Sequence, residues 1–134
     1  AEADPTSDVE GYDARYKAAI LATYLMDTPL HHEDIYCRGI SDLTLTKVKE
    51  AKAANKTWRM IARITKENDS VSASVMPEML DSDDPLAGVR GATNAIVYEG
   101  DSSGPLMLTG PGAGLVETGY SLLIDLIHYK RQNT

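Results

Sequence analysis

The stretch that decides the fold class is Trp58-Arg59-Met60-Ile61-Ala62-Arg63-Ile64-Thr65, in which one apolar series takes every second position. Successive side chains of a β-strand point to opposite faces of the sheet, so a repeat of two residues predicts a strand. The same repeat returns at Val71, Ala73 and Val75, after a polar turn over residues 66–70. Two neighbouring strands joined by a short turn are therefore expected here.

Helical spacing dominates the part of the chain that precedes these strands. Apolar residues recur at the spacing of one helix face over residues 12–26. Just upstream, Ser7-x-x-Glu10 matches a capping box, in which both side chains satisfy exposed backbone N–H groups at a helix start. A second helix is predicted over residues 45–54, with Thr44 as its N-cap.

A hairpin and a helix are predicted after the two strands. Residues 77–91 are interpreted as irregular. Residues 95–99 and 106–109 flank Gly100-Asp101-Ser102-Ser103-Gly104, a favourable hairpin turn, and a helix follows over residues 114–129. This order indicates a single α+β domain, residues 1–134, with helices on one face of a largely antiparallel or mixed sheet.

The final helix is apolar around most of its circumference, through Tyr120, Leu122, Leu123, Ile124, Leu126 and Ile127. A helix of this kind must be covered on more than one side, and four strands cannot easily do that. We therefore expect a further domain or a partner subunit to cover it. The alternative is a central core helix in a tightly wrapped small domain.

Composition excludes several classes of function. The chain has 134 residues, a formal net charge of −7 and a single cysteine, Cys37. An acidic chain is a poor partner for nucleic acid or an anionic membrane, and no apolar run approaches the ~20 residues of a membrane span. A lone cysteine excludes an intramolecular disulfide and fits a reducing compartment. We expect a cytoplasmic protein.

The first helix carries the residues with the most chemical promise. Asp13 and Lys17 are four positions apart, so their side chains share one helix face, and Asp8 and Glu2 lie just upstream. A lysine among carboxylates can donate a proton to a carbonyl oxygen, and carboxylates can hold a substrate ammonium group. On spacing alone, an ordinary surface ion pair is the more frequent explanation.

The glycine-rich stretch Gly110-Pro111-Gly112-Ala113-Gly114 precedes the final helix. Free N–H groups and the helix dipole favour an anion at such a position. Residues 115–134 are too few to add the second strand and ribose-binding acid of a dinucleotide-binding unit. The stretch therefore either touches a phosphate or nicotinamide bound mainly elsewhere, or is a tight strand-to-helix turn.

Two clusters invite a metal-binding interpretation, and neither has suitable spacing. The first, His31, His32, Glu33 and Cys37, has no second ligand cluster for zinc, and the acidic residues 81–84 lack the spaced ligands of a calcium loop. We expect solvated loops at both places, no metal site, and a buried rather than nucleophilic Cys37.

Two separated stretches resemble the homoserine dehydrogenase family. The first runs from Glu2 to Lys17 and follows E-x-D-P-x-x-D-x-x-G-x-D-x-x-x-K without gaps. The second, residues 110–114 with Thr118 and Asp125, resembles the family's closing G-x-G-A-G-x-x-x-T…D segment. Between them, Tyr36-Cys37-Arg38-Gly39-Ile40, Pro85-Leu86-Ala87 and Thr93-Asn94-Ala95 fall in family order. The resemblance thus covers essentially the whole chain.

The resemblance implies an NAD- or NADP-dependent interconversion of L-homoserine and L-aspartate 4-semialdehyde, within threonine, methionine and isoleucine biosynthesis. It implies that Lys17 is the catalytic lysine and that Asp13 orients it. By the same resemblance, Asp8 and Glu2 bind the substrate, whereas Gly112, Ala113, Gly114 and Thr118 approach the cofactor.

The resemblance also implies further parts of the enzyme. The family's Rossmann domain is missing from this sequence, so we expect a chain cut at a domain boundary that needs that domain for turnover. We also expect a homodimer formed through the sheet.

Two other interpretations stay open. One is a non-catalytic metabolite-binding or dimerisation module of the same descent, and the other is an oxidoreductase for a different semialdehyde. Retention of Asp13 and Lys17 argues against the first, and the acid-rich signature before Lys17 argues against the second.

Overall fold

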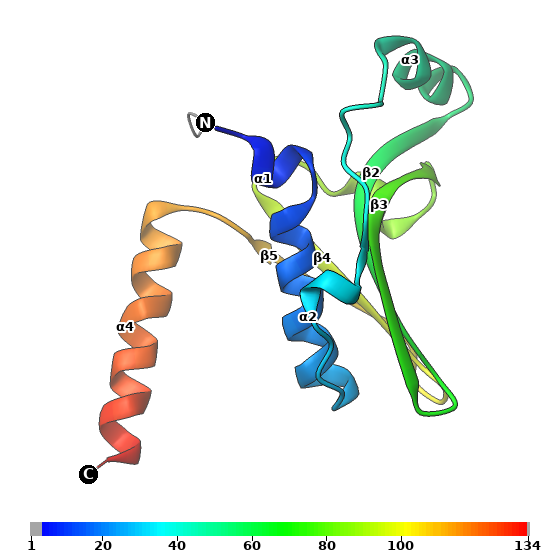
Figure 1. The fold of residues 1–134 in the computed structure, drawn as a ribbon. Helices are drawn as coiled ribbons and strands as arrows, with labels where there is room; N and C mark the ends of the chain where they lie inside the picture. The colour runs from blue at the N-terminus through cyan, green and yellow to red at the C-terminus, as the bar shows by residue number, and fades with distance from the viewer. Residues whose placement is uncertain (1–3, 134) are drawn as a thin grey trace. The chain divides into compact units, whose positions relative to one another are not determined.

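A computed structural model describes residues 4–133, which form two units that divide after Ala87. The first unit contains α1 (Thr6–Val9), α2 (Tyr12–Met26), η1 (His32–Asp34), β1 (Tyr36–Cys37), α3 (Leu45–Ala53), β2 (Lys56–Glu67) and β3 (Ser70–Asp81), as Figure 1 shows. The short η2 (Pro85–Gly88) lies at the boundary, and the second unit contains β4 (Thr93–Gly100), β5 (Gly104–Pro111) and α4 (Leu115–Gln132). The α+β class is confirmed, with the strands divided between two sheets.

A long antiparallel hairpin of β2 and β3 is the framework of the first unit, and β1 adds in parallel to β3. Asn68 and Asp69, with φ of 48° and 68°, form the tight turn between the two strands. Sequence periodicity located this hairpin correctly, but the predicted strands are shorter than those in the structure. The prediction that the chain is irregular from residue 77 is wrong as far as Asp81, because β3 continues through Pro77. Since β1 pairs only with Ser74 and Val75, β3 is an edge strand at Pro77 and tolerates a residue without an N–H.

The helix α2 packs on this sheet through its small residues. Ala18 and Ala22 are fully buried, and Ala18 forms a core cluster with Ile35 and Val75. Small side chains let the helix backbone approach the sheet closely, so the larger side chains of α2 remain on its outer face. The apolar core of the first unit therefore lies beneath α2, and the outer face of α2, which carries Asp13 and Lys17, is exposed.

The start of the chain differs from the predicted capping box. The helix α1 already begins at Thr6, its N-cap Pro5 makes no side-chain hydrogen bond, and the Glu10 carboxylate accepts from Ser41 rather than from a backbone N–H. The helical path breaks at Gly11, whose φ is 77°, and α2 begins there. By contrast, the predicted cap of α3 is confirmed, because the Thr44 side chain accepts from the backbone N–H of Lys47.

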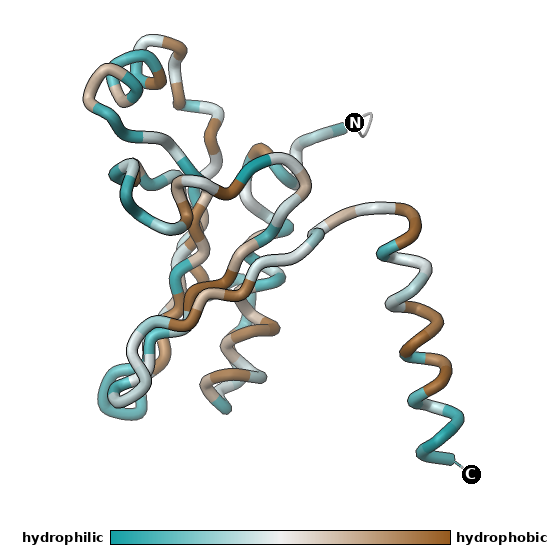
Figure 2. The backbone as a smooth tube through the Cα atoms, turned by 180° about the vertical axis from the view of Figure 1, so that it is seen from behind, coloured by the Kyte–Doolittle hydropathy of each residue, from teal (hydrophilic) through white to brown (hydrophobic). Residues whose placement is uncertain are grey.

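The second unit contains the predicted hairpin and final helix. β4 and β5 pair in antiparallel register from Thr93↔Pro111 to Gly100↔Gly104. No side chain of α4 is buried, and Figure 2 shows hydrophobic residues on successive turns of this helix before its hydrophilic C-terminal end. Within residues 4–133, no helix combines the length and the apolar character needed to cross a membrane.

Candidate functional site

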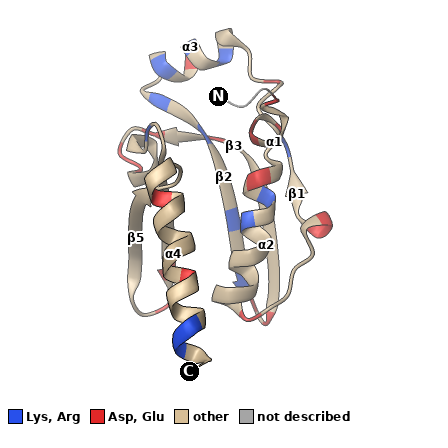
Figure 3. Ribbon diagram, turned by 90° about the vertical axis from the view of Figure 1, so that its left-hand side faces the viewer, with Lys and Arg blue, Asp and Glu red and all other residues tan. Residues whose placement is uncertain are grey.

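The Asp13–Lys17 pair lies on the outer face of α2. Lys17 Nζ is 2.6 Å from Asp13 Oδ2, and the two side chains are 55% and 46% exposed, respectively. Figure 3 shows acidic and basic residues on neighbouring turns of this helix. An exposed ion pair contributes about 0–1 kcal/mol to stability, so folding alone gives little reason for it. Both groups are accessible to a ligand.

Exposed aromatic and aliphatic residues flank this pair along α2. They are Tyr12, Tyr16, Ile20 and Tyr24. The Tyr16 ring also contacts His32, with ring centroids 4.8 Å apart. Contiguous exposed apolar residues around a charged pair are typical of a surface that another molecule or domain covers.

Arg15 was missed by the sequence analysis. Its guanidinium lies over the Tyr12 ring, with Cζ 5.3 Å from the ring centroid. Its Nε is buried and has no hydrogen-bond partner among the described residues. The sequence around Arg15 has no feature that distinguishes it from an ordinary solvent-exposed arginine.

Asp8 lies on the other side of the corner between α1 and α2. The Gly11 N–H donates to the Asp8 carbonyl over 3.2 Å, which closes the corner. Glu2, the other expected substrate ligand, lies outside the described residues. Of the two expected carboxylates, the structure therefore describes one, Asp8, which lies four positions before the start of α2.

A loop from a distant part of the chain contacts this corner. We call residues 37–41 the strap. The Ile40 N–H donates to the Val9 carbonyl over 2.8 Å, and the Cys37 thiol donates to the Glu10 carbonyl over 3.3 Å. The Ser41 hydroxyl donates to the Glu10 carboxylate. Sequence reasoning missed this contact, since Glu10 was assigned to a helix cap.

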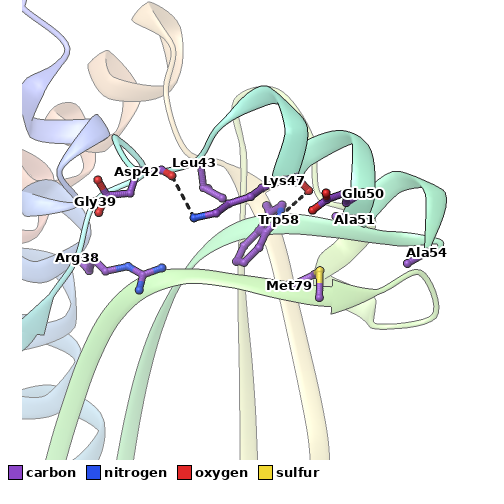
Figure 4. Close-up of a pocket in the computed structure, with 10 residues that line it drawn as sticks. All are labelled: Arg38, Gly39, Asp42, Leu43, Lys47, Glu50, Ala51, Ala54, Trp58 and Met79. Atoms are coloured by element: carbon purple, nitrogen blue, oxygen red, sulfur yellow. Dashed lines mark hydrogen bonds between the residues drawn. The ribbon is translucent and has the colours of Figure 1, made fainter.

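Two cavities adjoin the strap. One, of about 230 Å³, is lined by Glu10, Tyr12 and strap residues. The other, of about 400 Å³, lies beneath α3, where the Trp58 ring and Met79 face Lys47 and Glu50 (Figure 4). Neither of these two cavities is lined by Asp13 or Lys17.

The glycine-rich turn belongs to the second unit. The Gly112 N–H donates to the Ala92 carbonyl over 2.7 Å, and the Thr118 N–H donates to the Gly114 carbonyl as α4 begins. A Cβ at Gly114 would collide with the Glu117 carboxylate, so that carboxylate lies directly over the helix start. A carboxylate there competes with a phosphate for the same N–H groups.

Neither metal chemistry nor a reactive thiol finds support in the described residues. No group of three or more His, Cys, Asp or Glu side chains within residues 4–133 is placed to hold a metal ion. Burial raises the pKa of the Cys37 thiol, which disfavours the nucleophilic thiolate.

Comparison with known proteins gives one consistent result. The family model described as homoserine dehydrogenase matches residues 1–127. The NAD(+)-dependent homoserine dehydrogenase of Pseudomonas canavaninivorans is 45% identical over 100% of this chain and 38% of its own length. A crystal structure of S. aureus homoserine dehydrogenase has a TM-score of 0.88 at 39% identity, over 96% of this chain and 32% of that chain.

A third relative adds a cofactor-bound structure. A hyperthermophilic archaeal homoserine dehydrogenase mutant in complex with NADPH has a TM-score of 0.76 at 33% identity, covering 98% of this chain and 36% of that one. The chain thus spans about a third of the length of these relatives. Fold, sequence and coverage agree, and the chain belongs to the homoserine dehydrogenase family.

Proposed function

We propose that this chain is the substrate-binding and catalytic segment of an NAD(P)-dependent homoserine dehydrogenase, which interconverts L-homoserine and L-aspartate 4-semialdehyde. The observation that carries the proposal is the Asp13–Lys17 contact of 2.6 Å on the accessible face of α2. It lies within the region matched by the family model, and it sets an acid–base group beside a carboxylate.

Lys17 is the proposed proton donor and acceptor. In the reductive direction the Lys17 ammonium gives a proton to the aldehyde oxygen while the carbon receives a hydride, and in the oxidative direction the neutral amine takes the hydroxyl proton. Asp13 holds the Lys17 side chain in place through their ion pair. Asp8 is proposed to help bind the substrate, and Glu2 to contact its amino group, as carboxylates do.

The cofactor supplies or accepts the hydride when bound, and most of its contacts are proposed to come from a nucleotide-binding domain. The relatives support either nicotinamide cofactor, since one is named NAD(+)-dependent and another is in complex with NADPH. In this chain, Gly112, Ala113, Gly114 and Thr118 are proposed to approach the cofactor. Because the Glu117 carboxylate lies over Gly114, the nicotinamide end suits this turn better than a phosphate.

Further attributes belong to the same proposal. We propose a homodimer formed through the sheet and a role in threonine, methionine and isoleucine biosynthesis in the cytoplasm. The net charge of −7 argues against nucleic acid or an anionic membrane as a partner, and the single cysteine fits a reducing compartment.

The test is oxidation of L-homoserine by the full-length protein that contains this chain, with NAD+ or NADP+. We expect Lys17→Ala to lower kcat/KM by about 10²–10⁴-fold, the usual contribution of a proton-transferring group. Lys49→Ala is the matched control, because Lys49 is an exposed helix lysine remote in sequence from the pair. Circular dichroism and a melting curve establish that each variant is folded.

The outcomes separate the alternatives. A folded Lys17→Ala variant with unchanged turnover would remove Lys17 from the mechanism. A wild-type protein that binds L-homoserine without oxidising it would instead identify a non-catalytic module. Turnover of another semialdehyde in preference to L-aspartate 4-semialdehyde would identify the related oxidoreductase.

A further inference from the structure

We infer that the strap, residues 37–41, positions Asp8 relative to the Asp13–Lys17 pair, and that Ser41 and Gly39 are positioning residues of the substrate site. The inference rests on the proposed function and gives Ser41 and Gly39 a positioning role that the family resemblance did not assign to them. The juxtaposition that carries it is the contact of the strap with the corner between α1 and α2.

The helix α1 is not held by its own structure. It has four residues, no buried side chain and no side-chain N-cap. Helices this short are unstable in isolation. Asp4 accepts hydrogen bonds from the Thr6 N–H and hydroxyl, but these stay within the same turn. The orientation of Asp8 must therefore be fixed by contacts from elsewhere in the chain.

The strap supplies those contacts at three successive points. Val9 and Glu10 accept from the Ile40 N–H and the Cys37 thiol, respectively, and the Glu10 carboxylate accepts from the Ser41 hydroxyl. Gly39 lets the two segments come this close. A Cβ at Gly39 would lie 2.6 Å from both the Glu10 Cα and the Val9 carbonyl oxygen.

The strap itself is anchored to the sheet that also carries α2. Its first residue, Cys37, pairs with Val75 of β3, and the Arg38 N–H donates to the Val75 carbonyl over 2.8 Å. Val75 is fully buried and shares a core cluster with Ala18 of α2. Val75 thus holds both parts of the site in place. It binds the strap, which contacts the corner that carries Asp8, and it packs against α2, which carries Asp13 and Lys17.

This arrangement predicts a specific kinetic effect. Loss of the Ser41 hydroxyl removes one of the three contacts that hold the corner, which loosens α1 and Asp8 while α2 stays packed on the sheet. Binding of the amino-acid substrate should therefore weaken, whereas the proton transfer at Lys17 and the binding of the cofactor should not change.

The experiment is steady-state kinetics of the full-length protein with Ser41→Ala. We expect the KM for L-homoserine to rise about 3- to 10-fold, the usual range for one hydrogen bond. The KM for the nicotinamide cofactor and kcat should stay within about twofold of the wild-type values, because the lost hydrogen bond affects only the position of Asp8. Ser41→Thr keeps a hydroxyl and should restore the low KM. Ser72→Ala, on an exposed strand position, is the matched control.

A second variant keeps the test decisive if Ser41→Ala proves unstable. Glu10→Gln retains an acceptor oxygen for Ser41 and loses only the charge, so a smaller rise in the same KM is expected. Equal KM values for L-homoserine in wild type, Ser41→Ala and Glu10→Gln would overturn the inference, as would equal rises in the KM for both substrates. Inactivity of the wild type toward L-homoserine would overturn the proposed function instead.

Discussion

Gly11 is the residue on which the geometry of the corner depends. Its φ of 77° lies in the left-handed region, and a Cβ there would meet Val75 Cγ1 at 3.2 Å and Cys37 Sγ at 3.3 Å. We expect Gly11→Ala to lower the free energy of unfolding by about 1–3 kcal/mol, through backbone strain and crowding against the core. Urea titration followed by the fluorescence of Trp58, the single tryptophan of the chain, measures this change.

Gly88→Ala is the control for that substitution. Gly88 has no positive φ, and no atom lies within 4 Å of a Cβ built there. It should unfold within about 0.5 kcal/mol of wild type, as expected for an unconstrained surface position. Equal stability of the two variants would show that the Gly11 corner relaxes without cost.

Cys37 allows a prediction about pH dependence. Burial raises the pKa of its thiol, so the folded chain holds the proton more tightly than the unfolded chain. At pH 8 we expect iodoacetamide to alkylate Cys37 several-fold more slowly in the folded chain than in urea, because the thiolate is the nucleophile. The raised pKa therefore contributes to the stability of the folded chain below the pKa of the unfolded chain, and this contribution is lost as pH rises through the folded pKa. An alkylation rate in the folded chain equal to that in urea would contradict the assignment.

Single residues also show where sequence reasoning reached its limit. The Asp13–Lys17 contact was predictable, because helix geometry alone brings residues four apart together. The role of Glu10 was not, because its partner Ser41 is 31 positions away and a local capping box explained the same letters. Local patterns identify local contacts, and they give the wrong partner when a distant loop competes.

At the scale of elements, α2 depends on the absence of large side chains on its inner face. Ala18 is 0% exposed and contacts the Val75 cluster. We expect Ala18→Leu to destabilise the chain by about 1–3 kcal/mol, since a well-packed core cannot accept the added atoms without displacement. Ala53→Leu, at an exposed position of α3, should change stability by less than about 0.5 kcal/mol. The same urea titration compares the two, and a neutral Ala18→Leu would mean that α2 can shift on the sheet.

Element types were more predictable than their lengths. Alternation identified β2 and β3, and the cap at Thr44 set the start of α3, because each signal is a property of a few adjacent residues. The ends of β3 were not predictable in this way. Pro77 suggested a break, and only the shortness of β1 explains why the strand passes through it.

At the scale of the whole molecule, the exposed apolar surface of α4 leads to the final prediction. Its residues Leu115, Val116, Leu122 and Leu126 are 93%, 78%, 62% and 67% exposed, respectively. The sequence anticipated this surface from the apolar circumference of the helix, and it could not show what covers it, because a covering surface is not encoded in the helix itself. The chain spans about a third of the length of each relative, and we propose that the nucleotide-binding domain of the proposed enzyme covers this surface.

Hydrogen exchange tests this prediction directly. In the full-length protein, the backbone amides of residues 115–132 should exchange at least about tenfold more slowly than in the 134-residue chain alone, since packing one helix face suppresses its local opening. The amides of β2 and β3 are the internal control, because the first unit has its own core and should be protected similarly in both samples. Slower exchange in the full-length protein that is confined to α4 would show that the final helix packs against another part of that protein. Equal rates in the two samples would mean that the helix stays uncovered, and that the apolar surface serves a partner outside the full-length chain.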